Sequence, residues 1–289
     1  MSGFEASWLA LRARYDAAAR NPELLARLVA WRQQRGPLGL VDLGSGTGAT
    51  LRALAPVLGG EQRWLLVDHD PALLDTIQPE TRRWAETQGH EIHAAEAGFT
   101  LSGDGFSAQV TPFQADLSGG LSALPTQDAE IVTASALLDL VSAEWLELLV
   151  GFCCEHRLAC YAALSYDGDM GWNPQDRMDD DLHALFDRHQ RGEKSFGRAL
   201  GPDAARATAE CFTAAGFTVQ SGKSDWQMGG EDRDMQEALL AGYVQAAREL
   251  APDRSAEIEL WRQRRRMAIG IGSSRHRVGH IDILAIPKS

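Results

Sequence analysis

Positive charge, metal-binding cysteine patterns and long apolar runs are scarce in this chain of 289 residues. Its 28 Lys and Arg are outnumbered by 40 Asp and Glu, which gives a formal net charge of −12. Phosphates would be repelled by such a protein, so we expect no nucleic acid partner. A run of arginines at 262–266 is a local exception, but a charge run on a helix usually forms a solvated face.

The four cysteines contain no Cys-x-x-Cys pair, and no histidine spacing completes a zinc site. We therefore expect reduced thiols, a reducing compartment and no bound metal. No apolar run approaches the roughly 18 residues of a membrane span, and residues 1–5 lack the basic start and apolar core of a signal peptide. These absences predict a cytoplasmic protein with no membrane partner.

Repeats, low-complexity tracts and linkers are also missing, which favours a single domain over residues 1–289. Hydrophobic residues make up 44% of the chain, enough for a sizeable core. Apolar periodicity and cap residues predict helices over 6–19, 22–34, 71–87, 144–156, 201–216 and, in two parts, 232–268. Apolar runs predict strands over 38–43, 63–68, 106–114, 158–166, 217–223 and 278–286, and a further strand that opens into a loop within 128–139.

The most informative stretch is Val41-Asp42-Leu43-Gly44-Ser45-Gly46-Thr47-Gly48-Ala49. A buried strand, three glycines on alternate positions and a helix predict the front of a nucleotide-binding βαβ unit. Glycines let a ligand approach the main chain closely, and the first N–H groups of the helix are free to meet its polar atoms.

Different ligands could use this loop. Gly44-x-Gly46-x-x-Ala49 fits the dinucleotide fingerprint, so an NAD-dependent oxidoreductase is one alternative. Asp42, two positions before Gly44, disfavours it because a carboxylate there would repel a pyrophosphate. A glycine-rich turn that binds no ligand is another alternative.

The complete Gly-x-Gly-x-Gly spacing preceded by Asp42 resembles motif I of the class I S-adenosylmethionine-dependent methyltransferases. The resemblance covers about residues 38–225 and the last strand. It implies an α/β fold with a mostly parallel, seven-stranded, Rossmann-like sheet flanked by helices. It also implies S-adenosylmethionine (SAM) as cofactor, with Asp42 near its cationic methionine end and Gly44, Ser45, Gly46 and Gly48 forming the loop.

An acidic residue also ends the second predicted strand. Both SAM and NAD folds place a carboxylate at the position of Asp68, where it accepts hydrogen bonds from ribose hydroxyls. A helix cap is the alternative role, although Asp70, directly before Pro71, suits the cap better. His69 would flank the adenosine.

Asp116 and Leu117 follow the third predicted strand. Their position matches the segment where an acid hydrogen-bonds the adenine amino group in class I methyltransferases. A turn carboxylate is the alternative interpretation of Asp116.

Residues 128–139 resemble motif IV of the same family, which lines the cleft where the substrate meets the methyl group. Ser135 and Asp139 are its polar candidates. Asp139 either orients a nucleophile or caps the element that follows.

The segment before the first strand, residues 1–36, is expected to be helical. As a lid over the cofactor it would bring Arg12 and Tyr15 toward the ligand, and the alternative is a cover for the edge of the sheet. Residues 167–200 and 226–272 are expected to be substrate-side insertions. The first is a long polar loop with a central helical patch around residues 182–189, and long loops in compact domains are often functional.

The resemblance implies methyl transfer by in-line displacement, which depends chiefly on positioning. A general base is required only if the acceptor is protonated at attack. Asp139, Tyr166 and His183 are the candidate catalytic residues, and Trp172 and His189 are further candidates for contact with the acceptor. The acidic balance and the insertions favour a small-molecule acceptor. We expect a monomer or homodimer. Two alternatives keep the same cofactor: an enzyme that cyclises or rearranges SAM without methyl transfer, and a non-catalytic SAM-binding partner subunit.

Overall fold

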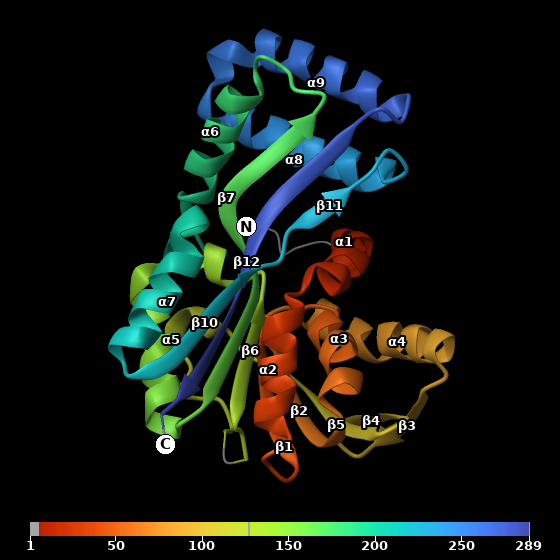
Figure 1. The fold of residues 1–289 in the computed structure, drawn as a ribbon, viewed down its shortest axis with the longest axis vertical. Helices are drawn as coiled ribbons and strands as arrows, with labels where there is room; N and C mark the ends of the chain where they lie inside the picture. Colours follow the sequence, from red (N-terminus) through yellow and green to blue (C-terminus); the bar gives the residue numbers. More distant parts are fainter. Residues whose placement is uncertain (1–5, 127, 289) are drawn as a thin grey trace.

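The computed structural model describes residues 6–126 and 128–288; the first five residues of the expected leader lie outside them. Figure 1 shows a lower part, in which helices flank a sheet, and an upper part built from α6, α8, α9, the short β11 and the ends of the long strands β7 and β12. The described chain begins with α1, which lies between the two parts, and it ends in the lower part.

The first half of the chain alternates helices and strands. Its elements are α1 (Ala6–Ala19), α2 (Pro22–Arg32), β1 (Leu38–Leu43), α3 (Ala49–Leu58), β2 (Gly60–Asp68), α4 (Pro71–Gln88), β3 (Glu91–Ala95), β4 (Gly98–Gly103), β5 (Phe106–Gln114), the 3-10 turn η1 (Leu117–Gly119) and β6 (Ile131–Ser135). The predicted bounds of α1, β1 and β5 are confirmed to the residue.

The second half contains the 3-10 turn η2 (Leu138–Leu140), α5 (Ala143–His156), β7 (Ala159–Asn173), α6 (Asp179–Gln190), β8 (Glu193–Lys194), β9 (Gly197–Arg198), η3 (Gly201–Asp203), α7 (Ala204–Ala214), β10 (Phe217–Lys223), β11 (Trp226–Met228), α8 (Arg233–Leu250), η4 (Pro252–Arg254), α9 (Ser255–Gly270) and β12 (Arg275–Pro287). The predicted bounds of β10 are confirmed to the residue. The helical segment predicted in two parts over 232–268 is confirmed as α8 and α9.

The central sheet has the order β5-β2-β1-β6-β7-β12-β10. The first five of these strands are parallel, and β12 is antiparallel to both of its neighbours. This is the expected Rossmann-like α/β fold, with one reversed strand. Three further strands, β3, β4 and β11, extend the sheet to ten. Because the chain leaves β1 for β2 on one side and returns to β6 on the other, a crevice forms at the carboxyl end of β1.

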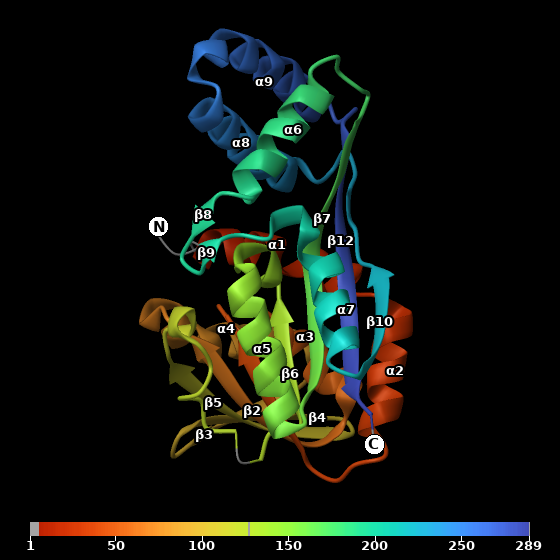
Figure 2. The same cartoon turned by 90° about the vertical axis from the view of Figure 1, so that its left-hand side faces the viewer.

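Two apolar layers hold the sheet in place. Helices α2, α3 and α4 pack on one face, and α5 and α7 pack on the other (Figure 2). All six residues of β1 are buried, because helices cover both of its faces. Burying a side chain such as Leu43 contributes roughly 1.5–3 kcal/mol, so the strand that carries the glycine loop is firmly positioned.

The expected polar segment after residue 166 contains the predicted helical patch, which is α6, but it does not begin as a loop. β7 continues to Asn173, and α6 and the β8–β9 hairpin follow it. The polar residues 167–173 form a strand because β12 pairs with them as far as Arg275, which satisfies their backbone groups. Their side chains are mostly half-buried, so the apolar pattern that marks a central strand is weak here.

The upper part has a core of its own. α6, α8 and α9 pack around Trp172, Tyr243 and Trp261 at the far end of β7. Within the described ranges, no helix combines the length and the apolar character needed to cross a membrane.

Candidate functional site

The glycine loop connects β1 to α3 at the crevice. Gly44, Gly46 and Gly48 have φ values of 64°, 52° and 79°, in the left-handed region that favours glycine. The N–H of Gly46 donates to Oδ2 of Asp68 across 2.8 Å, and the N–H of Asp70 donates to Oδ1 across 3.1 Å. Asp68 therefore fixes the loop against the end of β2, while Asp70 caps α4 as predicted.

Asp42 is fully buried below this loop. Thr133 Oγ1, on β6, donates to Asp42 Oδ1 across 2.7 Å, whereas Oδ2 has no hydrogen-bond partner among the described residues. Burial raises the pKa of Asp42 to about 7, although the hydrogen bond from Thr133 and the positive charge of Arg20 oppose this rise. A buried carboxylate with a free oxygen suits a cationic ligand group.

Arg20 supplies the opposite charge, and the sequence analysis missed it. Its side chain is buried, and Nη2 donates to Ser135 Oγ across 3.1 Å. Thr50 Oγ1 donates to the same oxygen across 3.1 Å. Arg20 Nε and Nη1 have no partner in the described part of the chain.

We call this cluster the Arg20–Asp42 site; it comprises Arg20, Asp42, Thr50, Thr133 and Ser135. It contains one positive and one negative side chain, each buried and each with unsatisfied polar atoms. Unsatisfied buried polar atoms cost about 1–3 kcal/mol each, and more when the group is charged. The cluster is therefore suited to a ligand that carries both an anionic and a cationic group.

α1 lies over the glycine loop (Figure 1). A Cβ on Gly46 would lie 3.1 Å from Leu9 Cδ1. The two predicted ligand contacts on this helix have partners within the protein: Arg12 pairs with Asp16 across 2.9 Å, and Tyr15 donates to Asp232 across 2.7 Å. The position of α1 is one that a lid would occupy, and its movement remains a prediction.

The residues expected near the adenosine gather at the carboxyl ends of β2 and β5. His69 is exposed, with Nδ1 3.3 Å from Asp68 Oδ1. Asp116 is exposed and accepts the N–H of Ser118 across 2.9 Å, a bond that lowers the pKa of the carboxyl. The side chain of Leu117 lies in the core, and its carbonyl oxygen accepts a hydrogen bond from Trp145 Nε1 across 2.6 Å.

Asp139 lies in the loop after β6. Burial raises its pKa to about 6, against the positive charges of Arg12 and Lys194, and its Oδ1 has no partner among the described residues. The cap of α5 is Ser142, whose Oγ accepts the N–H of Trp145 across 3.2 Å. The alternative that Asp139 caps this helix is therefore wrong.

Tyr166 and His183 are brought together by β7 and α6. Tyr166 is buried, and its hydroxyl donates to Asp187 Oδ1 across 2.7 Å. His183 Nε2 lies 3.3 Å from the Tyr166 oxygen and 3.6 Å from Asp187 Oδ1. Burial, and then the bond to Asp187, raise the pKa of Tyr166 well above its ordinary value. Asp187 was not singled out from the sequence.

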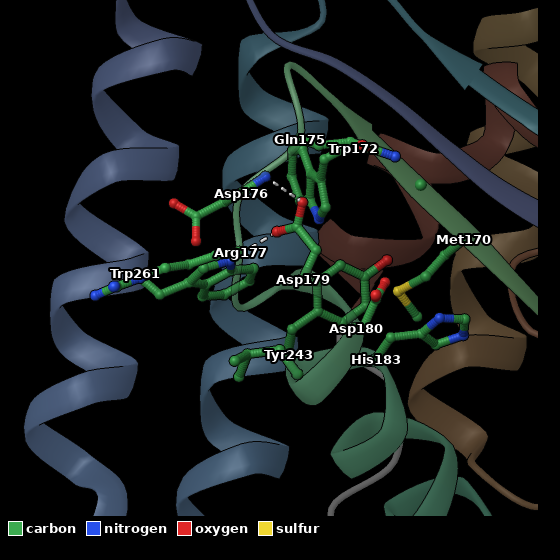
Figure 3. Close-up of a pocket in the computed structure, with 12 residues that line it drawn as sticks. Met170, Trp172, Gln175, Asp176, Arg177, Asp179, Asp180, His183, Tyr243 and Trp261 are labelled. Atoms are coloured by element: carbon green, nitrogen blue, oxygen red, sulfur yellow. Dashed lines mark hydrogen bonds between the residues drawn. The ribbon is translucent and has the colours of Figure 1, made fainter.

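The upper part contains a cavity of about 310 Å³. Figure 3 shows Asp179 between the backbone of Asp176 and the indole of Trp261, with hydrogen bonds of 2.8 Å to each. Trp172 and His183, two of the expected acceptor contacts, line this cavity. A third, His189, pairs instead with Glu249 across 3.0 Å.

No protein-family model and no curated protein sequence matches the chain. Among solved structures, it is similar to a proposed methyltransferase of Bacillus halodurans C-125, with 14% identity, 91% of this chain and 99% of that chain covered, and a TM-score of 0.49. The chain is also similar to the YcgJ protein of Bacillus subtilis, with 11% identity and a TM-score of 0.48. The match covers 93% of this chain and 100% of the YcgJ chain.

A third similar structure is a SAM-dependent methyltransferase of Geobacter sulfurreducens in complex with S-adenosyl-L-homocysteine. Its identity is 15%, each chain is covered completely, and the TM-score is 0.45.

Proposed function

We propose that this protein binds SAM and transfers its methyl group to a small-molecule acceptor. The observation that carries the proposal is the Arg20–Asp42 site, with opposite buried charges whose polar atoms lack partners. The methionine end of SAM carries an ammonium and a carboxylate. The ammonium would meet Asp42 Oδ2, and the carboxylate would meet Nε and Nη1 of Arg20.

The same site argues against a dinucleotide. A pyrophosphate has no cationic group to offer Asp42, and its charge would be repelled by that carboxylate. The ribose role of Asp68 remains open to SAM, because each of its oxygens accepts one backbone hydrogen bond and keeps a second lone pair. His69 and Asp116 would contact the adenosine from the ends of β2 and β5.

SAM supplies a methyl group activated by a positive sulfur, so the protein has mainly to align donor and acceptor. We assign His183 as the general base for an acceptor that loses a proton. Since Tyr166 donates to Asp187, its oxygen accepts from His183 Nε2–H, which leaves Nδ1 to take the proton. Tyr166 holds the ring in this tautomer. Asp139, which follows β6 and does not line the upper cavity, would orient only the part of the acceptor that reaches the methyl group.

The acceptor would occupy the cavity beside His183, whose volume of about 310 Å³ suits a small molecule. In this account the chain forms one methyltransferase domain, with residues 167–200 and 226–272 on the acceptor side. Of the leader expected over residues 1–36, α1 would be the lid, since α2 packs on a face of the sheet.

Calorimetric titration with SAM, S-adenosylhomocysteine and NAD tests the cofactor. We expect binding of the first two and none of NAD, and binding of NAD alone would refute the proposal. Mass spectrometry after incubation with SAM alone then tests the reaction. Intact SAM is expected without an acceptor, whereas a cyclised or rearranged product would support the alternative in which SAM itself is the substrate.

A further inference from the structure

A buried carboxyl group on the last strand holds the chain connection that carries Arg20. Asp282, on β12, is fully buried and accepts three hydrogen bonds. The N–H of Asn21 and the hydroxyl of Tyr161 donate to its Oδ2 across 2.9 Å and 2.8 Å, and the N–H of Leu164 donates to its Oδ1 across 2.8 Å. Because all three partners are donors and both oxygens accept, a carboxylate satisfies the set and a side-chain amide cannot.

An irregularity in the sheet places this carboxyl group beside the crevice. The pairing of β12 with β7 shifts between Ile281 and Ile283, on either side of Asp282, so β7 has one residue more than β12 at this point. Leu164, on the bulged strand, has φ 58°, in the left-handed region, and its N–H donates to the Asp282 side chain. The residue before it pairs with Ser135, at the end of β6. The three hydrogen bonds therefore lie at the edge of the sheet that carries the cofactor site.

Two partners of Asp282 hold Arg20 from different sides. Asn21 follows Arg20 in the chain, so the bond from its N–H fixes the backbone next to Arg20. Tyr161 lies against the side chain, because the Cζ atom of Arg20 is 5.9 Å from the centre of the tyrosine ring. Burial raises the pKa of Tyr161 well above its ordinary value, although the charge of Arg20 opposes this rise, so the hydroxyl keeps the proton that it donates.

We propose that Asp282 is a positioning residue of the cofactor site: it holds the backbone next to Arg20 and, through Tyr161, directs the guanidinium toward the carboxylate of the cofactor. The inference rests on the proposed function, in which that carboxylate binds Nε and Nη1 of Arg20. Two parallel N–H···O bonds require a fixed orientation of the guanidinium, and a side chain that is already held loses less freedom on binding. Asp282 should therefore strengthen the contact with the carboxylate alone.

Calorimetric affinities of two ligands test this role. S-adenosylhomocysteine carries both charged groups of the methionine end, whereas decarboxylated S-adenosylhomocysteine keeps the ammonium and lacks the carboxylate. The ratio of the two affinities therefore reports the contact with Arg20. Tyr161→Phe removes one donor to Asp282 and keeps the ring, and it should lower the ratio roughly fivefold, the effect of about one hydrogen bond. Asp282→Asn should lower the ratio at least as much. In both variants the affinity for the decarboxylated ligand should stay near the wild-type value.

Two controls separate positioning from a general loss of stability. Ile131→Val removes a methylene group from the core layer that also contains Tyr161, at the other end of β6 from Ser135. It should destabilise the fold and keep the ratio of affinities. In the Arg20→Met background, Tyr161→Phe should lower the ratio no further, because the side chain through which Tyr161 acts is gone.

The outcomes distinguish this inference from the proposed function. If the wild type preferred S-adenosylhomocysteine and Tyr161→Phe and Asp282→Asn kept that preference, the positioning role alone would be overturned. An equal loss of affinity for both ligands in the variants would indicate damage to the whole site and would overturn it as well. Absence of S-adenosylhomocysteine binding to the wild type would instead refute the proposed function, and the role of Asp282 with it.

Discussion

The backbone N–H of Gly46 donates a hydrogen bond of 2.8 Å to Oδ2 of Asp68, which joins the glycine loop after β1 to the end of β2. The same carboxylate accepts the N–H of Asp70 through Oδ1. One side chain thus shapes the loop and presents lone pairs where a ribose would lie. The cofactor site is built across two neighbouring parallel strands.

Asp68→Asn should weaken S-adenosylhomocysteine binding about 10- to 100-fold. The amide can accept only at one oxygen, and its NH₂ group would face either the N–H of Gly46 or that of Asp70. Calorimetry gives the affinity, and thermal unfolding should show a native-like fold. The control is Asp75→Asn, on the exposed side of α4, which should bind S-adenosylhomocysteine normally. If Asp68→Asn also bound it with undiminished affinity, another carboxylate would hold the ribose.

Gly46→Val should abolish cofactor binding and lower the free energy of unfolding by roughly 2 kcal/mol. The position has φ 52°, which costs a side chain about 1–2 kcal/mol, and a Cβ would press against Leu9. Gly151→Ala is a matched glycine substitution on α5 with open space around it, and it should stabilise the protein by about 0.5–1 kcal/mol. Normal binding by Gly46→Val would mean that the loop does not contact the ligand.

Affinity should depend on pH through Asp42. Its pKa of about 7 in the ligand-free protein means that the carboxyl is largely protonated below pH 7 and must ionise to pair with an ammonium. Binding of S-adenosylhomocysteine should therefore tighten as pH rises toward 7 and weaken about tenfold for each unit well below it. Asp42→Asn should bind S-adenosylhomocysteine more weakly, with an affinity that does not change between pH 5 and pH 8. If the affinity of this variant still depended on pH, another group would be responsible for the titration.

The free energy of unfolding of the ligand-free protein should fall as pH rises, whereas cofactor affinity should increase. Folding raises the pKa of Asp42 from its ordinary value of 3.8 to about 7, so the folded state binds more protons between pH 4 and pH 7. This group alone therefore makes the folded protein less stable as pH rises through that window, and the loss is complete above about pH 7. Chemical unfolding of the wild type and Asp42→Asn at pH 5 and pH 8 measures the difference, which should be smaller in the variant.

His183→Gln should reduce the rate of methyl transfer by 10²- to 10⁴-fold if the acceptor loses a proton. Cofactor affinity should not change, because His183 lies on α6 beside Tyr166 and not on the glycine loop. Transfer of labelled methyl from SAM to a small-molecule extract gives the rate, and His189→Gln is the control. Equal rates in the two variants would remove His183 from the reaction.

The cofactor half of the site could be predicted from the sequence because it rests on local patterns. Asp42, the three glycines and Asp68 lie at the ends of short apolar strands, and strand ends are readable from composition. Arg20 gave no such signal. It lies in a two-residue connection between helices, and its partner Ser135 is 115 residues away in the chain, so only the tertiary fold brings them together.

The acceptor half was harder to predict for a different reason. The polar end of β7 is a strand only because β12 pairs with it, and that pairing joins residues about 100 positions apart. Tyr166 and His183 were singled out as titratable residues, but Asp187, which orients them, has the spacing of an ordinary helix-surface carboxylate.

The central claim is that Arg20 and Asp42 bind the two charged groups of the methionine end of the cofactor. The most direct test compares the affinities of S-adenosylhomocysteine and 5′-methylthioadenosine, which lacks the amino-acid group. The wild type should prefer S-adenosylhomocysteine by at least about 100-fold, since two charge-assisted hydrogen-bonded contacts of about 1.5–3 kcal/mol each are at stake.

In Arg20→Met and Asp42→Asn this preference should fall at least tenfold, while affinity for 5′-methylthioadenosine stays near the wild-type value. Arg27→Met, an exposed arginine on α2, should keep the full preference. If the wild type bound both compounds equally, or if Arg20→Met weakened both to the same extent, the assignment of the Arg20–Asp42 site would be wrong.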